Sequence, residues 1–110
     1  MVIMKRNLTL ARNGHDLPVP ISIYAPEEVD SRWRCHFQIG WPEGDASRWG
    51  EGADAVQSLL IAMQMIGAEV YASKYHEAGQ LSWLAKGRGY GFPVAKTIRD
   101  LLVGDDKKFL

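Results

Sequence analysis

The sequence has one cysteine and no excess of charge of either sign, and both absences exclude classes of protein. Cys35 has no second cysteine with which to form an internal disulfide, which agrees with a reducing compartment. The 13 Lys and Arg residues balance 13 Asp and Glu residues, so the formal net charge is +0 at pH 7. A chain without net charge has no overall field that attracts phosphates or anionic lipids. We therefore expect it to bind neither nucleic acid nor a membrane surface.

Long hydrophobic runs are also missing. The chain turns polar at Lys5, before the apolar segment of a signal peptide could form. The longest apolar stretch, residues 53–72, is interrupted by polar residues, namely Asp54, Gln57, Gln64 and Glu69. A stretch this polar does not span a membrane. We therefore expect a cytoplasmic protein in which residues 53–72 form a helix of the core.

Motifs that bind metals or cofactors are missing too. The histidines, His15, His36 and His76, stand far apart, and no Cys-x-x-Cys, His-x-His or His-Glu-x-x-His spacing occurs. The glycine-rich segment 87–91 lacks both the spacing and the βαβ setting of a phosphate-binding loop. We therefore predict no metal and no cofactor, and an enzyme is the less favoured interpretation.

Several segments alternate between apolar and polar residues, the pattern of half-buried strands. Residues 2–11 alternate, and an Asn-Gly pair after them predicts a hairpin turn. Residues 17–25 alternate as well, but Pro18 and Pro20 lack backbone donors, so we expect this strand at a sheet edge. Residues 31–41 show the clearest alternation, and shorter segments predict further strands at 48–50 and 80–84.

From residue 54 the period changes from that of a strand to that of a helix. The helix is predicted to begin at Asp54 as its N-cap and to end near Ala72. Its predicted core face consists of Val56, Leu59, Leu60, Met63, Ile66 and Val70. Gly67, at the edge of this face, predicts a close approach of another segment. Residues 94–102 predict a short second helix after Pro93, and the tail from Asp105 is expected to fray.

Together these elements predict the fold class. We expect one α+β domain over residues 1–110, an antiparallel meander of four to five strands packed on one long helix, with a short C-terminal helix. A chain of 110 residues, 46% of them hydrophobic, is long enough to bury one core.

The predicted helix carries a second apolar stripe within its polar arc. This apolar stripe consists of Ile61, Met65, Ala68 and Ala72. An exposed contiguous apolar patch marks a contact surface. Two coverings are open: the chain's own C-terminal helix, through Ile98, Leu101 and Leu102, or a second subunit in a homodimer.

The adjacent Cys35 and His36 resemble a nucleophile and a base, but neighbours on a strand point to opposite faces of a sheet. Cys35 shares its face with Phe37, where a thiol behaves as a small hydrophobic group. No spacing argues that His15 or His76 approaches it. We therefore predict a structural role for Cys35.

The opposite face of the strand at 31–41 carries a polar row, which consists of Arg32, Arg34, His36 and Gln38. Arg48, on the next predicted strand, is expected to join it. Guanidinium and imidazole groups on one rigid sheet can bind an anion such as a carboxylate or phosphate. The favoured interpretation is nevertheless the solvated outer face of an antiparallel sheet.

Four short phrases resemble a family of small bacterial proteins of unknown function. They are Gly-Ala-Asp-Ala-Val-Gln at 52–57, Gln-Met-Ile-Gly at 64–67, Gly-Gln-Leu-Ser-Trp at 79–83 and Gly-Phe-Pro at 91–93. The resemblance spans residues 35–93, and it implies a cytoplasmic bacterial α+β domain. It implies no activity, cofactor or catalytic residue.

The sequence favours a noncatalytic protein-interaction or regulatory domain, acting as a homodimer or on a protein partner. The alternative is a small-anion-binding protein or an unrecognised enzyme that uses the polar row, which would require a cleft at that sheet face. A third interpretation is a structural subunit of a larger assembly that docks through the apolar stripe.

Overall fold

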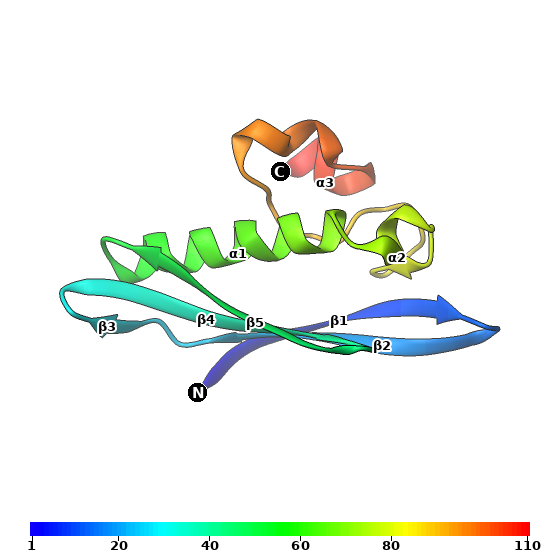
Figure 1. Cartoon of the computed structure of the whole chain (residues 1–110). Coiled ribbons are helices and arrows are strands. Elements are labelled where there is room, and N and C mark those ends of the chain that lie inside the picture. The colour runs from blue at the N-terminus through cyan, green and yellow to red at the C-terminus, as the bar shows by residue number, and fades with distance from the viewer.

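A long antiparallel sheet supports one helix across one of its faces (Figure 1). The computed structural model describes residues 1–110. The elements, in chain order, are β1 (Val2–Arg12), β2 (His15–Tyr24), β3 (Glu27–Val29), β4 (Arg32–Trp41), β5 (Gly44–Gly52), α1 (Ala55–Tyr71), α2 (Lys74–Glu77), β6 (Leu81–Ser82), the 3₁₀ helix η1 (Lys96–Leu101) and α3 (Gly104–Phe109). The predicted α+β class is confirmed, with a sheet of six strands instead of four or five.

The strands follow the order β5, β4, β2, β1, β6, and β3 pairs with the first residues of β4. The expected edge position of β2 is therefore wrong. β4 pairs only with the segment 21–23 of β2, so the part that contains Pro18 and Pro20 has β1 as its sole ladder partner. Gly40 lies against the Pro20 ring, because a Cβ added there would be 2.8 Å from Cγ of the ring. The prolines are tolerated because no strand needs their missing donors.

Glycines in β5 let α1 approach the sheet closely. A Cβ added to Gly50 would lie 2.5 Å from the backbone nitrogen of Ala62, and one on Gly52 would lie 2.6 Å from that of Ser58. The sequence predicted only residues 48–50 as this strand. Its polar and glycine-rich composition has low β propensity, and pairing with β4 along its whole length overrides that preference.

The ends of α1 are as predicted, but its buried face is turned. Asp54 caps the helix by accepting a hydrogen bond from the Gln57 backbone N–H at 2.8 Å. Val56 and Leu60, predicted for the core, are 75% and 48% exposed. Ile66 and Val70 are buried as predicted, and they are joined by Ser58, Ala62, Gly67 and Tyr71, which were not predicted. Small side chains face the sheet because the β5 glycines bring the backbones close.

The C-terminal segment differs from its prediction. The chain has no regular secondary structure at Pro93 and Val94, where it crosses α1, and a Cβ on Gly67 would collide with the Pro93 carbonyl. This confirms the close approach predicted at Gly67. The single helix predicted at 94–102 is replaced by η1, and the tail expected to fray forms α3. Both lie beyond α1 as seen from the sheet (Figure 1).

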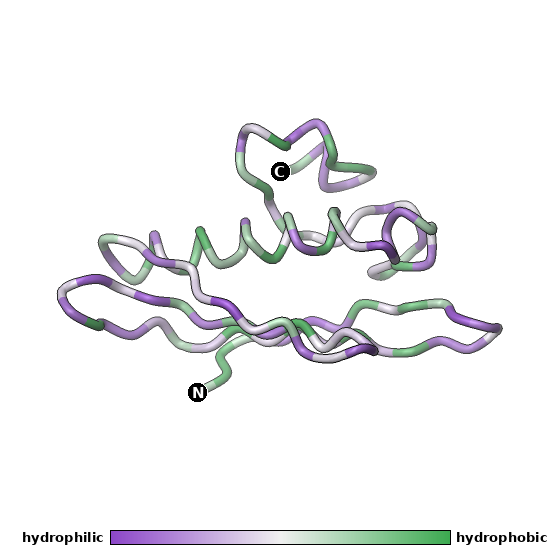
Figure 2. Tube along the Cα trace, in the orientation of Figure 1, coloured by the Kyte–Doolittle hydropathy of each residue, from purple (hydrophilic) through white to green (hydrophobic).

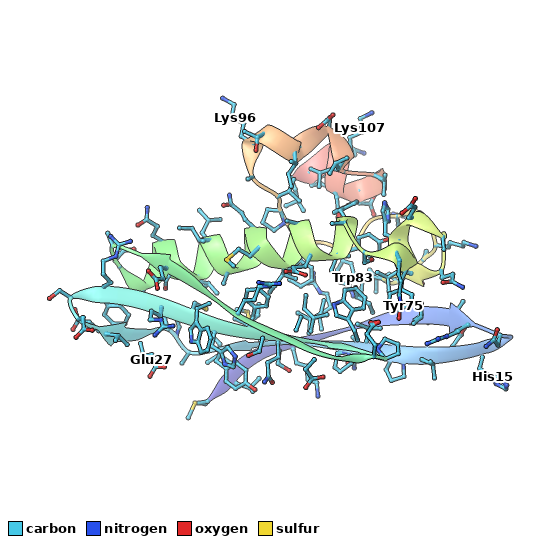
Figure 3. The ribbon with its side chains drawn as sticks, in the orientation of Figure 1. His15, Glu27, Tyr75, Trp83, Lys96 and Lys107 are labelled. Carbon is cyan, nitrogen blue, oxygen red and sulfur yellow. The ribbon has the colours of Figure 1, made fainter.

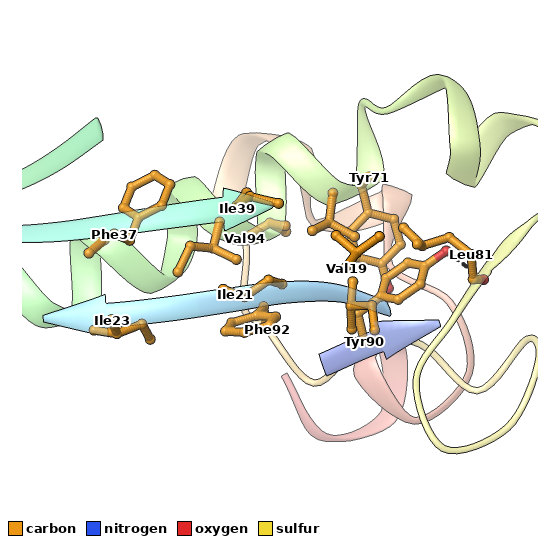
Figure 4. Packing of buried hydrophobic residues seen from close by; sticks show 14 of the residues in the cluster. Val19, Ile21, Ile23, Phe37, Ile39, Tyr71, Leu81, Tyr90, Phe92 and Val94 are labelled. Carbon is orange, nitrogen blue, oxygen red and sulfur yellow. Dashed lines mark hydrogen bonds between the residues drawn. The ribbon is translucent and has the colours of Figure 1, made fainter. Parts of the chain in front are cut away.

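The hydrophobic core lies between α1 and the sheet. In Figure 4 Phe92 lies beside Ile21, and Tyr90 lies near Val19, so the segment after β6 lies among the side chains of the sheet.

No helix of the structure is long and apolar enough to span a bilayer.

Candidate functional site

The outer edge of β1 is unpaired over most of its length. β6 pairs with only two residues of β1, and next to them the Ala11 N–H donates to the Gln80 carbonyl at 2.8 Å. Alternate residues of a strand direct their backbone groups to the same side, so those of Lys5 and Asn7 also point outward. No strand pairs with them there. Residues 3–7 therefore form a free edge.

An apolar groove of about 360 Å³ lies beside this free edge, between the sheet and α1. Its lining consists of Met4, Ile21, Ile23, Met63, Gly91 and Phe92, together with Lys5 and Arg6. The start of β1 is itself hydrophobic (Figure 2), and Met4 is 44% exposed. Exposed apolar side chains next to unpaired backbone are the usual composition of a strand-binding surface.

Arg6 fixes one end of the apolar groove. Its Nη1 donates to the carbonyls of Tyr90 and Gly91, each at 3.1 Å. Its guanidinium lies 3.8 Å from the ring centre of Trp83, the residue labelled between α1 and the sheet in Figure 3. Burial lowers the pKa of Arg6, and the charge of Asp106 opposes this shift. The guanidinium thus stays charged while it ties β1 to the segment after β6.

Asp106 holds the same segment from the other side. This buried carboxylate, 2% exposed, accepts hydrogen bonds from the Tyr71 hydroxyl at 2.6 Å and from the backbone N–H groups of Tyr90 and Gly91, each at 2.7 Å. Burial and the neighbouring Asp106 raise the pKa of Tyr71 well above its ordinary value. One carboxylate thereby joins α3, the end of α1 and the end of the apolar groove.

The sequence pointed to neither part of this arrangement. Asp106 lay in the tail expected to fray, and Arg6 was given no role in the strand predicted at 2–11. The Gly-Phe-Pro phrase at 91–93 was the available signal, because Gly91 has a φ of 75° and a side chain there would meet Arg6 and Trp83.

The polar row lies on the open face of the sheet, where three of its members contact the side chains of Tyr24 or Trp49. His36 stacks between Tyr24 and Trp49, with ring centres 4.6 and 4.8 Å away. Gln38 accepts a hydrogen bond from the Tyr24 hydroxyl, and Arg34 lies 4.7 Å from the Trp49 ring. Arg32 is exposed next to β3, where it pairs with Val29.

Arg48 does not join the polar row, so that expectation is corrected. It pairs with Phe37, whose side chain is buried on the α1 side, and its Nε lies 2.6 Å from a Glu69 carboxylate oxygen. Directly paired residues share a face of the sheet, so the register that sets Arg48 opposite Phe37 places Arg48 on the helix side. No cavity of the structure is lined by the polar row.

The apolar stripe lies on the β5 side of α1. Met65, Ala68 and Ala72 line a shallow hollow of about 380 Å³ together with Arg48 and Glu69, and Ile61 is half-buried. No residue of the C-terminal segment lines this hollow. Of the three residues expected to cover the stripe, Leu102 is buried, Ile98 is half-buried and Leu101 is 48% exposed.

Cys35 is buried, and its thiol lies within hydrogen-bonding distance of the Tyr24 carbonyl. Burial raises the pKa of this thiol, which disfavours the thiolate form. His76 contacts the Tyr90 hydroxyl instead of Cys35, beside a cavity of about 130 Å³. No three His, Cys, Asp or Glu side chains gather as metal ligands.

The comparisons with known proteins agree with the resemblance in the sequence. A family model described as a domain of unknown function (DUF6968) matches residues 4–94. No curated protein and no solved structure matches the chain. The matched range includes all residues that line the apolar groove, and it leaves out Asp106. The chain therefore belongs to the DUF6968 family.

Proposed function

We propose that this chain is a noncatalytic protein-interaction domain that binds an extended segment of another polypeptide along β1. The observation that carries the proposal is the free edge next to the apolar groove. A strand added to a sheet edge gains main-chain hydrogen bonds, and its alternate side chains enter adjacent pockets. The free edge offers the main-chain hydrogen bonds, and the apolar groove offers the pockets for alternate side chains.

The groove suits one side of an added strand. Side chains of an extended segment alternate between the two faces of the sheet it joins. Those on the α1 side would lie against Met4, Met63 and Phe92, which come from three different elements or segments. Burying two such apolar side chains contributes roughly 1.5–3 kcal/mol each before the cost of ordering the segment.

Peptide selection and amide exchange test this proposal together. A displayed random-peptide library is selected against the folded chain, and amide hydrogen exchange is then measured by NMR with the enriched peptide. We expect the amides of Lys5 and Asn7 to exchange rapidly in the free protein and to become protected on binding. The amides of Arg6 and Leu8, which point toward β2, serve as the internal control because the β1–β2 pairing already protects them.

Two α1 variants locate the bound peptide. Met63→Asp places a charge in the apolar groove and should weaken binding at least tenfold. Val56→Asp is the matched control, because Val56 is exposed on the same helix and does not line the groove. Failure to enrich any peptide, or equal affinities for the two variants, would contradict docking at this site.

A homodimer through the apolar stripe is the second candidate. Arg48 and Glu69 stand together at the rim of the hollow, so a two-fold contact could exchange this ion pair between copies. Sedimentation equilibrium checks it: a dimer that Met65→Glu dissociates supports the candidate, and a monomer at high concentration contradicts it. A cytoplasmic location is part of the proposal, because a lone free cysteine suits a reducing compartment.

A further inference from the structure

We infer that the segment bound at β1 is an apolar–acidic–apolar strand of a different protein, and not β1 of a second copy of this chain. The inference rests on the proposed docking at the free edge. It is carried by the charges around the apolar groove and by the position of Lys5 on β1.

Both charged residues at the apolar groove are cations: Arg6 closes one end of it, and Lys5 adjoins it at the free edge with its ammonium group on the other face of the sheet. Neither has a carboxylate within salt-bridge distance, since the ion pairs of the structure involve Arg34, Arg48, Lys74 and Arg88. The nearby carboxylate of Asp106 is buried and already accepts three hydrogen bonds. The site therefore presents positive charge that an incoming carboxylate can pair with.

Lys5 sets the position of that carboxylate. Lys5 pairs with Ser22, and its neighbour Met4 lines the apolar groove, so the Lys5 side chain lies on the open face of the sheet. The residue opposite Lys5 on an added strand shares that face. Its two neighbours in the added strand then point toward α1 and the groove. In an apolar–acidic–apolar strand, the acidic side chain therefore lies next to the Lys5 ammonium group while the two apolar side chains enter the apolar groove.

The same residue disfavours self-pairing. Two copies of β1 that pair antiparallel over the whole free edge, residues 3–7, are related by a two-fold axis at Lys5. This register places the two ammonium groups directly opposite each other, and like charges at directly opposed positions destabilise a strand pair. A lysine on an exposed edge is a common means of preventing such pairing.

The test compares peptides selected by three forms of the protein: wild type, Lys5→Glu and Lys96→Glu. Lys96 is the control because it is an exposed lysine on η1, away from β1 (Figure 3). We expect the wild type and Lys96→Glu to enrich peptides with Asp or Glu between two apolar residues. Lys5→Glu should lose this acidic preference and should bind the wild-type peptide roughly three- to tenfold more weakly.

The outcomes separate this inference from the proposal beneath it. Apolar strands enriched without an acidic preference would overturn the inference and leave docking at β1 intact. A wild type that enriches no peptide would overturn both. Sedimentation adds an independent check: a dimer of the wild type that Asn7→Pro dissociates would identify a second copy as the occupant and overturn the inference, because proline removes the outward N–H at that position.

Discussion

His76 shows how a single side chain is controlled by its surroundings. Its ring packs edge-on against Tyr71 and Tyr90, and its Nδ1 contacts the Tyr90 hydroxyl. Burial lowers the pKa of His76 below 6.5, and burial together with Asp106 raises that of Tyr90 to about 12. Lys86 is the charged residue, apart from His76 itself, that lines the adjacent cavity. The fold therefore favours the neutral forms of both rings.

This gives a pH dependence of known sign. Because the folded-state pKa of His76 lies below its unfolded value of about 6.5, the unfolded chain binds the proton more readily. The free energy of unfolding should therefore fall as the pH drops from 7 through 6.5 toward 5. Thermal melts across this range should show a flatter dependence for His76→Phe than for the wild type, and His15→Phe, at the exposed hairpin, is the control for replacing a histidine. Identical slopes for wild type and His76→Phe would contradict the assignment.

At the scale of elements, sequence periodicity identified the strands at 2–11, 17–25 and 31–41 and the helix with its Asp54 cap. Periodicity failed where contacts with other elements determine which face of a helix is buried or whether a segment forms a strand. The apolar residues of α1 alone do not show which of its faces is buried. The glycines of β5 let the helix face with small side chains, such as Ser58 and Ala62, pack closely against the sheet. The same holds for β5, which lacks strand-forming residues and is held by its pairing with β4.

The contact between β5 and α1 can be tested with one methyl group. Gly50→Ala places a Cβ 2.5 Å from the Ala62 backbone nitrogen, so the helix has to move away from the sheet. We expect a loss of about 1–3 kcal/mol in the free energy of unfolding, measured by urea denaturation. Asp45→Ala is the control, since it introduces the same side chain at an exposed position of β5. A loss no larger than that of the control would show that the packing has room to adjust.

At the scale of the whole molecule, the candidate site was out of reach of the sequence. The free edge exists because β6 pairs with only two residues of β1, and a pairing length is not visible in one chain. The apolar groove joins side chains as distant as Met4, Met63 and Phe92. From the sequence, each of these residues looks like an ordinary apolar residue of a strand, a helix or a loop. Only the tertiary arrangement gives them a shared role.

The C-terminal segment is connected to this site through Asp106. Its carboxylate accepts hydrogen bonds from the Tyr71 hydroxyl and from the Gly91 N–H, and Gly91 lines the apolar groove. Tyr71→Phe removes the hydrogen bond to Asp106, and also the one that the Val103 N–H donates to the hydroxyl, without changing the ring. We expect faster exchange of the Gly91 amide and roughly threefold weaker binding of the selected peptide, because the end of the groove is held less firmly.

Tyr75→Phe provides the matched control for this coupling. The Tyr75 hydroxyl also donates to a carboxylate, that of Glu43, but neither residue lines the groove. Both variants lose a tyrosine–carboxylate hydrogen bond, and urea denaturation of each corrects for the further hydrogen bond to the Val103 N–H that Tyr71→Phe loses. Weaker peptide binding in Tyr71→Phe alone would therefore arise from the connection through Asp106 and Gly91. Equal weakening in the two variants would mean that α3 stabilises the fold without acting on the groove.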